Sequence, residues 1–76
     1  MWINGEWAYY YCRYVEDDPE IRRYIIEPKW AYRYCLDVKD DPVVAKYITD
    51  SYWAFWYYKQ VKDDPKKARK YINKEN

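Results

Sequence analysis

The chain has 76 residues, a net charge of +1 and no histidine. This length fits one domain close to the lower size limit for a stable core, so large side chains must provide the buried surface. Twelve Tyr, five Trp and one Phe provide it, and they argue against disorder despite a mean hydropathy of −0.99. No apolar run approaches the roughly 20 residues of a membrane span. We therefore expect a cytoplasmic protein with no membrane association.

The charges are unevenly distributed along the chain. Residues 1–27 carry three basic and six acidic side chains, whereas residues 59–76 carry seven basic and three acidic ones. The middle of the chain is balanced. The sequence thus has an acidic N-terminal part and a basic C-terminal part.

A 23-residue repeat organises the whole sequence. Its most visible markers are a tryptophan and a proline that each recur at this interval, namely Trp7, Trp30, Trp53, Pro19, Pro42 and Pro65. The surrounding segments read EWAYYYCRYVEDDP, KWAYRYCLDVKDDP and YWAFWYYKQVKDDP. We predict a single domain, 1–76, made of the units 4–26, 27–49 and 50–76.

Each unit is predicted to hold two short helices in chain order. In the first unit they span 5–16 and 19–26, in the second 28–39 and 42–49, and in the third 51–62 and 65–73. Each second helix begins at Asp-Pro, because Asp suits the N-cap and Pro the first helical position, and the preceding helix must stop before it. The predicted caps are Asn4, Asp18, Glu27, Asp41, Asp50 and Asp64.

One side of each first helix is predicted to form the core. Spacing at 100° per residue places a repeated apolar stripe there, made of Trp7, Ala8, Tyr11, Cys12 and Val15 and their equivalents Trp30, Ala31, Tyr34, Cys35, Val38, Trp53, Ala54, Tyr57, Tyr58 and Val61. Second-helix residues would cover this stripe: Ile21, Tyr24, Ile25, Val44, Tyr47 and Ile48. Isolated helices of this length are marginal, so they require their neighbours. We predict an all-α fold, three tandem helix-turn-helix repeats stacked as a small α-solenoid.

The last predicted helix differs from its two counterparts. Lys66 and Lys67 replace Val43 and Val44 there. A terminal repeat needs such a solvated outer face.

The segments resemble a known type of repeat. WAYRYCLDVKDDPVVAKYI and its sister segments are similar to short helical repeats of bacteriophage and related bacterial proteins, which read approximately W-A-Y-x-Y-A-R-x-V, a loop, a Pro and a helix ending in Tyr-Ile. The loop is shorter here, with Asp-Asp-Pro in place of a longer basic segment. The resemblance implies a phage-type origin and a helical repeat, and it implies no activity or site residue.

The sequence offers little for catalysis or metal binding. Cys12 and Cys35 take the same position in consecutive units, which favours two small buried residues over a disulfide or a zinc site. The Asp-Asp pairs fall short of the six to eight oxygens of a calcium site; capping explains one Asp of each pair and solvation the other. We expect no enzyme and no cofactor or metal.

Binding is the remaining class of function, and the variable side of the first helices is its predicted site. The units differ there while the stripe is kept, and Tyr, Trp and Arg are the residues typical of interface anchors. The candidate protein-binding residues are Tyr10, Arg13, Tyr14, Arg33, Leu36, Trp56 and Lys59. They predict a protein-binding module, with a phage-type inhibitor or adaptor of a host protein as one form of it. Ordinary surface is the competing interpretation.

Two alternatives stay open from the sequence. The basic C-terminal part could contact nucleic-acid phosphates through Lys59, Lys62, Lys66, Lys67, Arg69 and Lys70, although the near-zero net charge is untypical of such domains. The acidic and basic ends could also attract one another in salt-sensitive head-to-tail association. The polar last helix favours a monomer.

Overall fold

The computed structural model describes residues 3–72, and all its regular elements in this range are helices. The elements are α1 (Gly5–Tyr14), α2 (Pro19–Arg22), α3 (Pro28–Asp37), α4 (Pro42–Ala45), α5 (Ser51–Trp56), a π-helix η1 (Tyr57–Val61) and α6 (Pro65–Ile72). No strand occurs among the described residues. The predicted all-α fold is confirmed. The predicted ends at residues 1–2 and 73–76 lie outside the described residues.

The predicted helix starts are confirmed. Asn4 accepts a hydrogen bond from the amide N of Trp7 at 2.8 Å, and Asp50 accepts one from Tyr52 at 2.8 Å. The three Asp-Pro caps work in the same way, since the carboxylates of Asp18, Asp41 and Asp64 each accept from an amide two or three residues later. Glu27 is the exception, because its side chain makes no capping bond.

The helices end earlier than the sequence predicts. The amides of Glu16, Lys39 and Lys62 each donate to a carbonyl five residues back, at 3.0, 3.2 and 3.1 Å. This widened last turn ends the regular α pattern, and in the third unit it extends into η1. The second helices in the first two units are single turns, four residues instead of the predicted eight.

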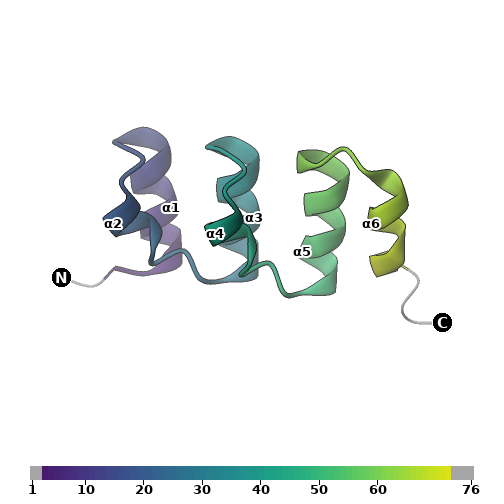
Figure 1. Ribbon diagram of the computed structural model, residues 1–76. Helices are drawn as coiled ribbons and strands as arrows, with labels where there is room; N and C mark the ends of the chain where they lie inside the picture. The colour runs from purple at the N-terminus through teal and green to yellow at the C-terminus, as the bar shows by residue number, and fades with distance from the viewer. Residues whose placement is uncertain (1–2, 73–76) are drawn as a thin grey trace.

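The units line up in one direction. In Figure 1, α1, α3 and α5 stand side by side, and α2 and α4 lie in front of α1 and α3. The resulting shape is elongated, with extents of 44 × 21 × 16 Å.

The core follows this row of helices. Fully buried side chains include Ala8, Tyr9, Ile25, Tyr34 and Val44. The predicted stripe is buried or partly buried throughout the second and third units, whereas in the first Trp7 is 39% and Val15 is 68% exposed. Val15 was therefore wrongly predicted as core. Among residues 3–72 no earlier unit lies against α1, whereas α1 covers α3 and α3 covers α5.

A tyrosine and an aspartate join each unit to the next. The Tyr34 hydroxyl donates to Asp17 Oδ1 at 2.7 Å, and the Tyr57 hydroxyl donates to Asp40 Oδ1 at the same distance. Both contacts span 17 positions, so the repeat reproduces them. A lysine supports each carboxylate, Lys39 at 3.6 Å from Asp17 and Lys62 at 2.7 Å from Asp40. We refer to these two contacts as the Tyr–Asp links.

The links correct one prediction. The first Asp of each Asp-Asp pair was expected to be merely solvated, yet Asp17 and Asp40 are interface residues. Asp63, the third copy, instead has a backbone φ of 54°, in the left-handed region.

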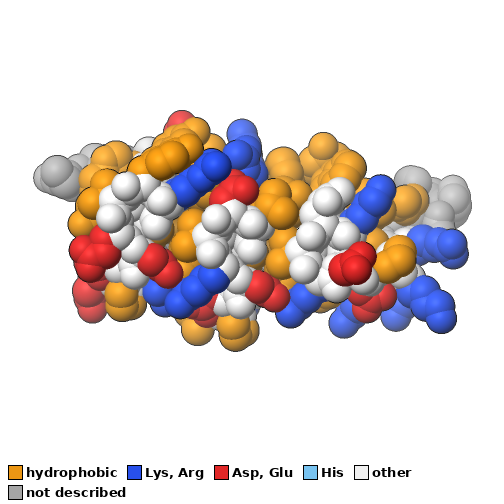
Figure 2. Space-filling view, turned by 90° about the horizontal axis from the view of Figure 1, so that it is seen from above, with side chains coloured by type: hydrophobic (Ala, Val, Ile, Leu, Met, Phe, Trp, Pro, Cys, Tyr) orange, Lys and Arg blue, Asp and Glu red, His pale blue; other side chains and the backbone are white. Residues whose placement is uncertain are grey.

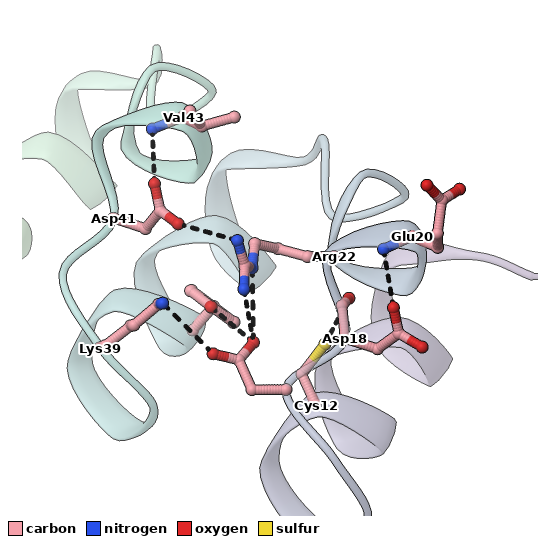
Figure 3. Close-up of polar contacts among 9 residues, drawn as sticks. Cys12, Asp18, Glu20, Arg22, Lys39, Asp41 and Val43 are labelled. Atoms are coloured by element: carbon pink, nitrogen blue, oxygen red, sulfur yellow. Dashed lines mark hydrogen bonds and ion pairs between the residues drawn. The ribbon is translucent and has the colours of Figure 1, made fainter.

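Arg22 adds a further bridge between the first two units. Its guanidinium lies 3.3 Å from Asp17 and 3.1 Å from Asp41, the cap of α4 (Figure 3). The equivalent residue of the second unit is Ala45, which cannot hold Asp64 in the same way.

The last helix consequently occupies a different place from α2 and α4. In Figure 1, α6 stands beside α5, where the first helix of a further unit would stand. The Tyr58 and Tyr71 rings stack there at 5.7 Å. Val44 of α4 is 2% exposed, and Lys67 is the equivalent residue of α6. If α6 lay in front of α5, as α4 lies in front of α3, it would bury the ammonium group of Lys67. The expectation of a terminal unit with a solvated outer face agrees with this arrangement.

The Tyr–Asp links predict a selective effect of removing one hydroxyl. Tyr34→Phe or Tyr57→Phe should lower the free energy of unfolding by about 1–2 kcal/mol, because each deletes a hydrogen bond to a charged acceptor at a part-buried site. Tyr11→Phe is the matched control, since within residues 3–72 the Tyr11 hydroxyl makes no such link to an aspartate. Urea denaturation followed by circular dichroism measures all three. Equal losses in the three variants would contradict the role of the links.

The same links predict that stability falls at both extremes of pH. Burial alone would raise the pKa of Asp17 and Asp40, but hydrogen bonds from Tyr34 and Tyr57 and the nearby Arg22 and Lys62 lower it overall. Burial, and then the bonds to these carboxylates, raises the pKa of Tyr34 and Tyr57.

The stabilisation that Asp17 and Asp40 provide is therefore complete above the unfolded aspartate pKa of about 4. It is lost as the pH falls through the lower pKa that these carboxyls have in the folded protein. The stabilisation that the Tyr34 and Tyr57 hydroxyls provide is complete below about pH 10. It is lost as the pH rises towards the raised pKa values that these hydroxyls have in the folded protein. Urea denaturation between pH 2 and 11 should show both losses. A double Tyr34→Phe, Tyr57→Phe variant should show a flatter curve, and an unchanged curve would be evidence against this origin.

Candidate binding surface

The predicted protein-binding residues share one side of the row of first helices. Tyr10, Arg33 and Trp56 are equivalent positions of the three units, as are Arg13, Leu36 and Lys59. Around the helix, Tyr10 and its equivalents lie about 160° from Cys12 and its equivalents, and Arg13 and its equivalents lie about 100° from them. Cys12 faces the start of α2, with its Sγ 4.0 Å from the carbonyl oxygen of Asp18. The candidate residues therefore lie on the side away from α2 and α4, and we call them, with Tyr14, the strip.

The strip carries alternating ring and cationic groups. Figure 2 shows hydrophobic side chains with Lys and Arg side chains between them along its upper edge, which is the side away from α2 and α4. Tyr10, Tyr14 and Leu36 are 43%, 66% and 42% exposed. Arg33 and Trp56 are half-buried. The structure thus exposes most of the predicted strip.

Two arginines of the strip are held by a buried tyrosine and a carboxylate. The Tyr9 hydroxyl donates to Asp37 Oδ2, and Arg13 Nη1 donates to the Tyr9 hydroxyl oxygen at 2.9 Å. Arg33 Nε lies 3.4 Å from the same Asp37 oxygen, and Arg13 lies 3.6 Å from it. Burial, and then the bond to Asp37, raises the pKa of Tyr9, so this hydroxyl stays a donor. These contacts hold the two guanidinium groups in place.

Stacked rings continue the strip on α1. The Tyr10 ring lies 6.1 Å from that of Tyr14 and 5.8 Å from that of Trp30, and the Arg13 guanidinium lies 4.9 Å over the Tyr14 ring. Such contacts leave ring faces and cations together at the surface.

The third unit ends the strip with another ring and cation. Lys59 Nζ lies 5.4 Å from the Trp56 ring and 5.7 Å from the Phe55 ring. Beside them is an apolar recess of about 200 Å³ between α5 and α6, lined partly by Phe55, Ala68 and Ile72. In the first two units a tryptophan packs on the residue equivalent to Phe55, at 5.3 Å for Tyr9 with Trp30 and 5.4 Å for Tyr32 with Trp53. The recess therefore occupies the position that an indole fills between inner units.

The residues of the nucleic-acid alternative do not form one uniform surface. Lys62 is paired with Asp40, and Lys67 Nζ lies 4.8 Å over the Tyr58 ring. The remaining cations on α6 are exposed: Lys66, Arg69 and Lys70. Figure 2 shows Lys and Arg side chains gathered at the C-terminal end of the molecule. Lys59 belongs to the strip.

The cysteines and carboxylates fit structural roles. Cys12 and Cys35 are free and buried, as predicted, and burial raises the pKa of both thiols, that of Cys35 to about 11. Within residues 3–72 no group of three Cys, Asp or Glu side chains is placed to hold a metal ion. None of the helices described has both the length and the apolar character needed to cross a membrane.

Some residues of the surface were missed by sequence reasoning. Tyr9 and Asp37 are 28 positions apart and this pair occurs once, because their equivalents are Tyr32 and Gln60, so comparison of the repeats gives no signal for it. The spacing of the Tyr–Asp links, in contrast, recurs and was available from the sequence.

Comparison with known proteins gives no match among protein-family models, curated proteins or solved structures. The resemblance to phage-type repeats therefore stays a prediction.

Proposed function

We propose that this chain is a non-enzymatic module that binds a protein along the strip. The observation that supports this most is the arrangement of exposed rings around arginines that are already fixed by Tyr9 and Asp37. Ordering long side chains on binding is costly, so a surface whose cations and rings are held beforehand loses less free energy when a partner docks.

The charge of the strip indicates the chemistry of the partner. Arg13 and Arg33 share one carboxylate, Asp37, and Lys59 adds a third cation over the Trp56 ring, so the strip is cationic although the chain is nearly neutral. Tyr and Trp rings beside them favour apolar and aromatic contacts. The partner surface we propose is acidic with at least one aromatic or aliphatic anchor, and the recess beside Phe55 is suited to that anchor. These contacts would be enough for a small inhibitor or adaptor to bind its partner.

Nucleic-acid binding is the weaker candidate. One observation favours it, the exposed cluster Lys66, Arg69 and Lys70 on α6. Three cations on one short helix give few phosphate contacts, and the acidic residues of the first unit would repel a polyanion that followed the molecule.

The strip predicts which substitutions weaken partner binding. A triple variant Tyr14→Ser, Leu36→Ser, Lys59→Glu should bind at least tenfold more weakly to a partner captured by the wild-type chain, because it removes two exposed apolar contacts and reverses one charge. Affinity is measured by surface plasmon resonance after identification of the captured protein.

The control carries matched changes on exposed positions away from the strip: Tyr24→Ser, Lys46→Glu and Val43→Ser. It should retain affinity within about twofold, and both variants should keep the wild-type helical spectrum. Loss of binding in the control, or full binding in the strip variant, would contradict the proposed surface.

A mobility-shift titration at low salt separates the alternative. The protein-binding function predicts no retardation of single- or double-stranded DNA or RNA. Retardation that disappears in a Lys66→Glu, Lys70→Glu variant, and that weakens steeply with salt, would favour the nucleic-acid function.

A further inference from the structure

A groove of about 530 Å³ lies on the front of the molecule, on the opposite side from the strip. One wall is α4 with the segment after it, including Ala45, Ile48 and Thr49. Ala54 and Tyr58 lie on α5 and η1, and Tyr71 of α6 completes the lining. The groove exists because α6 stands beside α5 and leaves the front of α5 uncovered (Figure 1).

The preceding unit shows what this kind of groove holds. The wall residues Pro42, Ala45, Lys46 and Ile48 are equivalent to Pro19, Arg22, Arg23 and Ile25 of the first unit. There the same wall faces α4 through Val43, Val44 and Tyr47, and only a recess of about 190 Å³ remains.

The two units differ in how deeply one equivalent isoleucine is buried. Ile25 is 1% exposed and shares its recess with Val44 of α4, whereas Ile48 remains partly exposed on the wall of the groove. The chain thus buries this position in one unit and leaves it partly open in the next. In the first unit, α4 shows which kind of segment fits against this wall. This internal example defines the expected partner of the groove more closely than an apolar surface alone would.

The chain's own helix cannot readily take the place. Asp63 turns the backbone away with its positive φ, and Lys66 and Lys67 stand where Val43 and Val44 would face the wall. The arginine that ties Asp41 to the first unit is replaced by Ala45. Three independent features therefore keep α6 out of the groove.

Charges at the margin indicate the start of the expected segment. Lys46 lines the groove, and Lys67 Nζ lies 4.8 Å over the ring of Tyr58, which also lines it. A helix preceded by acidic residues, as α4 is preceded by Asp40 and its N-cap Asp41, would place carboxylates near these ammonium groups.

We propose that the groove binds a short helical segment of another protein, with an Asp-Pro start and the pattern Pro-Val-Val-x-x-Tyr, in the position relative to α4 that α4 takes relative to α2. The segment needs β-branched residues at its second and third helical positions, where Val43 and Val44 stand in α4. This site is separate from the strip and does not depend on the function proposed for it.

The probe is a synthetic peptide with the sequence of residues 40–49, DDPVVAKYIT, added to the isotope-labelled full chain. We expect saturable NMR shifts at Ala45, Thr49 and Ala54, with a dissociation constant on the order of 10⁻⁴–10⁻³ M because a short peptide must order itself on binding. The same peptide with Val44→Lys should give no saturable shifts.

Matched variants of the protein test the location. Thr49→Trp, at an exposed position that lines the groove, should weaken peptide binding at least fivefold. Val43→Trp, at an exposed position that lines the smaller recess, should leave it within twofold. The strip variant should bind the peptide like the wild type, which separates failure of this site from failure of the strip.

Several results would overturn the proposal. They are absence of saturation at about 5 mM peptide, equal binding of the Val44→Lys peptide, or insensitivity to Thr49→Trp. Proximity signals between Lys67 and Ile48 in the free chain would show that α6 fills the groove itself. Concentration-dependent shifts at the groove without peptide would assign it to a second copy of the chain.

Discussion

The contact between one unit's tyrosine and the preceding unit's aspartate is the constraint on which the stack depends. A helix of about ten residues gains too little from its own hydrogen bonds to persist alone, so each unit must be held by its neighbour. The ring of Tyr34 is fully buried, and its hydroxyl still needs an acceptor. Asp17 provides it from the loop of the unit before, where the Asp-Pro turn holds it. The link therefore allows a large ring to enter the core without an unpaired polar atom.

The third unit shows how a repeat stops. Asp63 cannot receive a tyrosine from a following unit among the described residues, and its backbone takes up a left-handed conformation instead. The chain then turns so that α6 covers α5 from the side, with lysines outward. Because α6 covers the side of α5 that faces away from α3, the front of α5 stays uncovered. The groove is thus a consequence of termination, and the conformation of Asp63 with the lysines of α6 contributes to both.

The repeat explains why the sequence predicted so much of the fold. Positions that serve every unit recur every 23 residues, so Asp-Pro caps, helix starts and the buried Cys12 and Cys35 were all readable. The C-terminal ends of the first helices were harder to predict. The widened turns at Glu16, Lys39 and Lys62 depend on backbone geometry, which the spacing of side chains does not encode. Val15 was misplaced for another reason. It has the same spacing as Val38 and Val61, and its exposure is decided by the absence of a described neighbour on that side of α1.

Residues that occur only once in three units mark where the chain departs from a uniform stack. Arg22 ties the first two units together at the front, and its replacement by Ala45 leaves the next junction untied. Tyr9 and Asp37 act at the back, where they fix Arg13 and Arg33 among exposed rings. A uniform scaffold requires neither set, because the Tyr–Asp links already join the units. The two places where the repeat is broken are also the two surfaces with unfilled apolar or cationic character, and this coincidence is the physical basis for proposing that both faces bind.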